Sequence, residues 1–127
     1  MASVADWLKI IHFQILAVLV LAAVYVGNTC ACSTKDKAVR AAVKSDLRNL
    51  GTAQEMLWAD EGHYALTWSS LDFESSIGVS IVIDGATSTG WSARGTHPAM
   101  RWTCAIYVGD APRPREDAVE GEVVCWE

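Results

Sequence analysis

The stretch AVRAAVKSDLRNLGTAQEML, residues 38–57, carries a single apolar stripe at the spacing of an α-helix. Its alanines have high helix propensity, and Gly62, which follows Glu61, predicts where the helix ends. Gln54 lies on the same face as the stripe. The apolar members recur at steps of four, four, three and seven residues: Val39, Val43, Leu47, Leu50 and Leu57. A single stripe predicts that this helix packs one face against another layer.

Downstream of this helix, the pattern predicts a small antiparallel sheet. Apolar and polar residues alternate in short segments that are separated by turn residues. Residues 79–83, closed by Asp84 and Gly85, and residues 102–108 alternate in this way, the latter most clearly. Residues 90–95 around Trp91 and the apolar run 123–126 are two further candidate strands. Trp58, Trp91 and Trp102 are expected to fill the core. The predicted fold class is therefore α+β, a long N-terminal helix packed on a head of three to four antiparallel strands.

Upstream, residues 15–26 are all Ile, Leu, Val, Ala or Tyr. Extended back to Trp7, this apolar segment would form a helix of roughly 30 Å, about one hydrocarbon thickness. No proline occurs before Pro98, so we expect the segment to continue into the amphipathic helix. Three interpretations compete: a single transmembrane anchor, a cleaved signal peptide, and a buried helix of a soluble protein. We adopt the transmembrane anchor, because a core this small would not easily cover a helix that is apolar on all sides.

Charge is distributed unevenly along the 127 residues. Residues 1–44 contain five Lys/Arg and two Asp/Glu, a net charge of +3, whereas residues 45–127 contain five and thirteen, a net charge of −8. The acidic head would repel phosphate backbones, which argues against general nucleic-acid binding by the head. The basic residues that follow the apolar segment favour a cytoplasmic C-terminal part. The cysteines favour the opposite side, and we follow the cysteines because long domains translocate despite flanking charge.

The four cysteines form two pairs of different character. A disulfide between Cys104 and Cys125 would tie the last strand to its neighbour, would stabilise the head by about 3 kcal/mol, and would imply an oxidising compartment. The alternative is two free, buried thiols. Cys30 and Cys32 are too closely spaced for a zinc site and point to different helix faces. They are either small residues without chemistry or candidates for an intersubunit disulfide.

No set of residues predicts catalysis, a metal site or a cofactor. Residues 60–63 place two carboxylates beside His63, but without a spaced partner motif they indicate a solvated helix end. Residues 90–95 resemble a nucleophile elbow, yet Arg94 occupies the position where that motif needs its second glycine. We therefore expect a protein that is not an enzyme.

Four motifs together resemble bacterial type IV pilins and their pseudopilin relatives. They are residues 41–50 followed by residues 52–55, the run Asp60-Glu61-Gly62-His63-Tyr64, the run Gly90-Trp91-Ser92-Ala93 followed by His97, and the placement of Cys104 and Cys125. The resemblance covers residues 39–126. It implies a long N-terminal helix carrying a four-stranded antiparallel head, and subunits that polymerise by burying their apolar half-helices together in a filament core.

The N-terminus departs from the pilin pattern, because no glycine precedes the apolar segment. Removal of Met1 alone would place Asp6 four residues after a new Ala2 terminus, where its carboxylate could pair with a neighbour's amine. The residues expected to line the subunit contact in the filament core are Leu16, Leu19, Val20 and Ala23.

The predicted organisation is residues 1–34 as membrane anchor, filament-core half-helix and joint, and residues 35–127 as the head. The expected function is that of a structural subunit of a type IV pilus-like filament. Its partners would be copies of itself, the inner membrane before assembly, and the pilus or secretion assembly machinery. It would span the inner membrane once and then form an extracellular filament. The alternatives are a type II secretion pseudopilin, or a membrane-anchored domain that binds a ligand through loops 63–76 and 109–117 without polymerising.

Overall fold

The structure is a computed structural model that describes the backbone of residues 4–127 and the side chains of Gln14 and residues 34–127. It divides into two compact units, Met1–Lys35 and Asp36–Glu127, each of which is described by itself. Its elements are the helix α1 (Val4–Glu61), a short 3-10 helix η1 (Trp68–Ser70), and the strands β1 (Ser80–Ala86), β2 (Gly90–Thr96), β3 (Thr103–Gly109) and β4 (Val124–Trp126). The predicted α+β class is confirmed.

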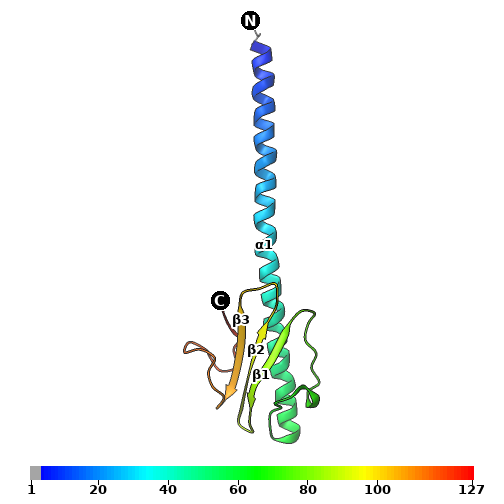
Figure 1. The fold of residues 1–127 in the computed structure, drawn as a ribbon, viewed down its shortest axis with the longest axis vertical. Helices are drawn as coiled ribbons and strands as arrows, with labels where there is room; N and C mark the ends of the chain where they lie inside the picture. Colours follow the sequence, from blue (N-terminus) through cyan, green and yellow to red (C-terminus); the bar gives the residue numbers. More distant parts are fainter. Residues whose placement is uncertain (1–3) are drawn as a thin grey trace. The chain divides into compact units, whose positions relative to one another are not determined.

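The sheet of the second unit is antiparallel throughout, with the strand order β1-β2-β3-β4. Figure 1 shows β1, β2 and β3 side by side next to the C-terminal part of α1. Because each strand follows its neighbour in the chain, short turns suffice to connect the first three strands. The prediction of three to four strands is confirmed.

The predicted apolar stripe forms the contact between α1 and the sheet. Val43, Leu47 and Leu50 are completely buried and share one core cluster with residues of all four strands. Gly95 in β2 allows this close approach, since a Cβ there would lie 2.7 Å from Cγ1 of Val43. The helix thus meets the sheet across a strand position that has no side chain, which brings the leucines into contact with the core.

Helix α1 ends where the sequence predicts. Gly62 has a positive φ of 71°, and its N–H donates a hydrogen bond of 2.8 Å to the carbonyl oxygen of Trp58. This is the left-handed C-terminal cap for which glycine is preferred.

Strand β1 does not end at Asp84 and Gly85, so that prediction is wrong. The strand passes through an irregularity between Ile83 and Gly85 and continues to Ala86. The turn to β2 is instead built by Thr87, whose N–H donates to the carbonyl oxygen of Gly90 at 2.8 Å. The hydroxyl of Thr87 also accepts the N–H of Gly90 at 3.0 Å. A bulge accommodates the extra residue, and side-chain capping then forms the turn without an Asp-Gly pair.

Two buried polar side chains of α1 hold the long loop between α1 and β1. Asp46 accepts the N–H and the hydroxyl of Ser76 at 2.7 and 2.9 Å. Gln54 donates to the carbonyl oxygen of Ala65 at 2.7 Å and accepts its N–H at 2.8 Å. Polar groups are tolerated in this core because they replace the hydrogen bonds that the loop backbone would otherwise make with water.

The three tryptophans expected in the core have different environments. Trp91 is completely buried, as predicted, and Trp102 is half-buried beneath the guanidinium of Arg40, whose Cζ lies 4.0 Å from the ring centroid. Trp58 retains 44% exposure, so its assignment to the core is wrong. Its N–H reaches the carbonyl oxygen of Ser88 at 2.9 Å. This hydrogen bond is available only at the periphery, where the indole lies against the β1–β2 turn.

Candidate functional site

A groove of about 690 Å³ lies in the surface of the Asp36–Glu127 unit. One wall is a face of α1 that contributes Arg48, Gly51 and Glu55. The opposite wall comes from the segment between β3 and β4, and the floor lies over Trp91 and Val108. This volume is in the range of small-molecule binding sites.

The α1 wall follows directly from helical spacing. Gly51 and Thr52 each lie three or four residues from both Arg48 and Glu55, so the four form one face beside the buried stripe. A Cβ at Gly51 would lie 3.5 Å from Cζ2 of Trp91, an ordinary van der Waals distance. Packing against Trp91 therefore does not require glycine at this position. The absence of a side chain at Gly51 instead leaves the groove wider.

The opposite wall protects the open edge of β3. Strand β4 pairs only with the first part of β3, and its register places Cys104 opposite Cys125. Farther along, the N–H of Gly121 donates to the carbonyl oxygen of Tyr107 at 2.9 Å. The N–H of Gly109 donates to Oε1 of Glu120 at 2.7 Å. A backbone group and a carboxylate thus take the place of a longer edge strand.

The predicted disulfide is present and closes this segment. The sulfur atoms of Cys104 and Cys125 are 2.07 Å apart, and Cys104 is completely buried. The bond joins β3 to β4, so the whole segment from Gly109 to β4 is held at both ends. The wall that carries Glu120 is therefore anchored to the sheet rather than free to move as a loop.

Two carboxylates and a phenol gather near the groove. The hydroxyl of Tyr64 donates to Oε1 of Glu55 at 3.1 Å. Burial raises the pKa of Tyr64, and the hydrogen bond to Glu55 and the negative charges of Glu55 and Glu120 raise it further. Tyr64 therefore remains a protonated donor at neutral pH. Arg48, on the same wall as Glu55, makes no ion pair with any residue in the described range.

The floor of the groove contains a polar atom without a partner. The Nε1 of Trp91 is buried and has no acceptor among the residues whose side chains the structure describes. Because Trp91 is completely buried, this N–H does not face the groove as an accessible donor. The site offers charge at the rim, hydrogen bonding from the walls and apolar contact at Val108.

The carboxylates at the end of α1 do not build a metal site. Nε2 of His63 lies 3.5 Å from Oε2 of Glu61, and both side chains are more than half exposed. Over residues 34–127 and Gln14, no group of three His, Cys, Asp or Glu side chains could hold a metal ion. Residues 60–63 are predicted to form a solvated helix end, and all four are exposed in the structure.

The other residues assigned to the site from the sequence lie outside the described side chains. These are the filament-core residues Leu16, Leu19, Val20 and Ala23, the charge-pairing candidate Asp6, and the intersubunit disulfide candidates Cys30 and Cys32. Among the residues that are described, no helical stretch is both long enough and apolar enough to cross a membrane.

Sequence reasoning did not find the groove. Gly51, which interrupts an otherwise strong helical pattern, was the available signal, because a glycine inside a helix often has a packing or functional reason. No sequence pattern pointed to Glu120, because its role is to accept the N–H of Gly109 at the edge of β3, eleven residues away in the chain.

Comparison with known proteins assigns no family to this chain, because neither a protein-family model nor a curated protein matches it. The resemblance to type IV pilins rests on the motifs within residues 39–126. Since one fold can serve many functions, the function is argued below from particular residues.

Proposed function

We propose that this protein is a structural subunit of a type IV pilus-like cell-surface filament that assembles through its apolar N-terminal segment. One observation carries the proposal. Val43, Leu47 and Leu50 of α1 are completely buried against residues of the sheet, so the head has a core built from its own helix and strands. We assign the apolar run of residues 15–26 to lipid or to contact with copies of itself, because an apolar helix is stable in either environment.

The energetics of this exchange favour reversible assembly. Moving an apolar helix from a bilayer into a bundle of identical helices replaces one apolar environment by another, so packing decides the association. Small residues let helices approach closely, and the segment contains Ala17, Ala22 and Ala23. We assign Leu16, Leu19, Val20 and Ala23 to the contact. A contact between different surfaces of identical subunits does not close, and so it builds a filament.

The Cys104–Cys125 disulfide supports an extracytoplasmic head, since such bonds persist in oxidising compartments. In this proposal the chain spans the inner membrane once, with its head outside the cytoplasm, and is then transferred by an assembly machinery into a filament at the cell surface.

The test is the substitution Val20→Asp, which places a charge in the proposed helix contact. We expect loss of filaments in sheared surface fractions examined by negative-stain electron microscopy, because an unpaired carboxylate in an apolar bundle is costly. The matched control is Val82→Asp, since Val82 lies on β1 with 51% exposure and takes no part in the core cluster. If cells producing the Val20→Asp chain still form normal filaments, the proposal is wrong.

A membrane-anchored binding domain that never polymerises is the second candidate, and the groove between α1 and Glu120 is the observation in its favour. Crosslinking through Cys30 in intact cells separates the two functions. A ladder of multimers supports the filament, whereas monomers and dimers alone support the anchored binding domain.

A further inference from the structure

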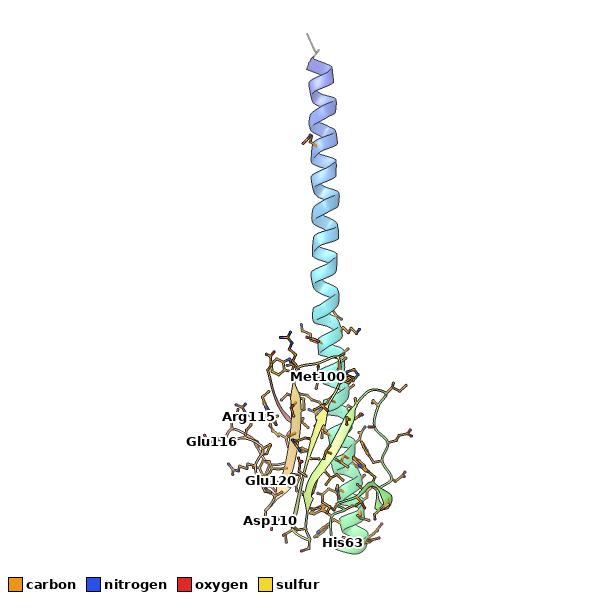
Figure 2. All side chains as sticks on the ribbon, viewed as in Figure 1. His63, Met100, Asp110, Arg115, Glu116 and Glu120 are labelled. Atoms are coloured by element: carbon orange, nitrogen blue, oxygen red, sulfur yellow. A yellow bond between two sulfur atoms is a disulfide. The ribbon has the colours of Figure 1, made fainter. Side chains whose placement is uncertain are left out.

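Basic side chains gather at the end of the head where β2 leads into β3. We call Lys37, Arg40, Lys44 and Arg101 the basic end. Lys37 and Arg101 are exposed, and none of the four makes an ion pair within residues 34–127. The exposed Asp36 adjoins Lys37, and the exposed Glu127 follows Trp126, which pairs with Thr103, so the net side-chain charge of this end is +2. The stacking of Arg40 on Trp102 at 4.0 Å places the loop that carries Arg101 against α1. In Figure 2, Met100 marks this end of the head.

The opposite end of the head carries acidic side chains. We call Glu55, Asp60, Glu61, Asp110 and Glu120 the acidic end; all five are exposed. Figure 2 places Asp110 and Glu120 toward the end away from Met100. His63, two residues after Glu61 in the chain, lies toward the same end. The chain has no Lys or Arg between Arg48 and Arg94, so α1 changes from basic to acidic along its length within the head.

The acidic end is electrostatically unfavourable by itself. Asp60 and Glu61 occupy the last turn of α1, which contains no basic residue. The C-terminus of a helix carries partial negative charge from its free carbonyl groups, so carboxylates there are repelled. Of the two, Glu61 has one partner in the described part of the chain, the exposed His63.

The two ends of one head cannot neutralise each other. Lys37 and Glu61 are separated by a helical rise of roughly 36 Å. Salt screens charges over about 8–10 Å at physiological ionic strength, so the attraction between the two ends within one molecule is negligible. Opposite charges on two surfaces of one head are therefore available to a second molecule.

We infer that the basic end of one head docks on the acidic end of another copy of this chain. The argument for this occupant is charge complementarity: within residues 34–127, the four cations make no ion pair and the five exposed carboxylates have no Lys or Arg partner. The contact is heterologous, so it repeats in one direction without closing, as a filament requires. The inference rests on the proposed function and adds to it a second, ionic contact between subunits.

The experiment measures the concentration of full-length subunits that remains unassembled in equilibrium with filaments. Reversal of the basic end by Lys37→Glu with Arg101→Glu, or of the acidic end by Asp60→Lys with Glu61→Lys, raises this concentration by at least about tenfold, because each introduces repulsion across the contact. The chain with all four substitutions has both ends reversed and returns to near the wild-type value. Raising the salt concentration to about 0.5 M weakens wild-type assembly.

The matched control is Arg113→Glu with Arg115→Glu, which changes the net charge equally at two exposed positions outside both ends. We expect this control to stay within about twofold of the wild type, and circular dichroism verifies that each variant is folded.

The outcomes separate the two proposals. Filaments that form in the wild type but respond neither to salt nor to charge reversal overturn the ionic contact and leave the proposed function standing. Assembly that is weakened by the basic-end variant but not by the acidic-end variant also overturns the ionic contact. That result assigns the cations to another partner, such as anionic lipid. Absence of wild-type filaments under every ionic condition overturns both.

Discussion

At the scale of single residues, Gln54 shows how a polar side chain belongs in the apolar stripe. It is completely buried among the residues that pack α1 on the sheet. Its amide satisfies both backbone groups of Ala65, which is itself buried. The Gln54 amide both donates and accepts a hydrogen bond here, so it replaces a pair of backbone hydrogen bonds and fixes the start of the α1–β1 loop.

Replacing Gln54 by leucine should therefore destabilise the head despite the added apolar area. Both the N–H and the carbonyl of Ala65 lose their partner in a buried place, at about 1–3 kcal/mol each, so we expect the free energy of unfolding to fall by about 2–5 kcal/mol. Urea denaturation followed by tryptophan fluorescence measures it. Thr52→Ala, an exposed change two positions earlier, should stay within about 0.5 kcal/mol. A Gln54→Leu chain as stable as wild type would refute this role.

At the scale of elements, the segment from Gly109 to β4 behaves as a substitute for a full edge strand. The disulfide ties its end to β3, and Glu120 and Gly121 bond two backbone groups in the part of β3 that β4 does not reach. The segment also forms a wall of the groove, so the stability of this edge and the shape of the candidate site depend on the same contacts.

Loss of the disulfide should loosen this whole segment. We expect reduction of the wild-type chain to lower the free energy of unfolding by about 3 kcal/mol, because the reduced unfolded chain regains the freedom of the 21-residue separation between the cysteines. The urea midpoint with and without dithiothreitol gives the difference. Cys104→Ala with Cys125→Ala provides the control, since dithiothreitol should leave the urea midpoint of the head unchanged in that chain. An unchanged wild-type midpoint would contradict the prediction.

At the scale of the whole molecule, the protein consists of two compact units, Met1–Lys35 and Asp36–Glu127. The Asp36–Glu127 unit has a core, a disulfide and a sheet of its own. A head of about 90 residues can bury enough apolar surface to be stable, particularly with a disulfide.

The fragment Asp36–Glu127 should accordingly fold without the apolar segment. We expect it to be monomeric at high salt, to contain the Cys104–Cys125 bond, and to unfold in one cooperative transition in differential scanning calorimetry. The full chain in detergent micelles is the reference and should unfold within a few degrees of the fragment. If the fragment lacks a transition, the head needs residues 15–26 for its core and the proposed function loses its basis.

The sequence by itself determined the elements and their order. Helical periodicity identified the stripe from Val39 to Leu57, in which only Val39 stays half-buried, and glycine chemistry identified the cap at Gly62. Alternation located β1 and β3, whereas β2 and β4 were indicated by their residue types. These signals are local, because a residue's neighbours along the chain decide its helical or strand conformation. The same locality explains the errors. Asp84 and Gly85 look like a turn, and only pairing with β2 shows that they belong to a bulged strand.

Only the tertiary structure decided which surfaces exist. It placed Trp58 at the periphery, brought Glu120 to the edge of β3, and opened the groove beside Gly51. It also sorted the charges of distant segments into a basic and an acidic end. None of these follows from periodicity, since each depends on contacts between residues far apart in the chain. Such contacts form only when the helix and the sheet pack together around the core.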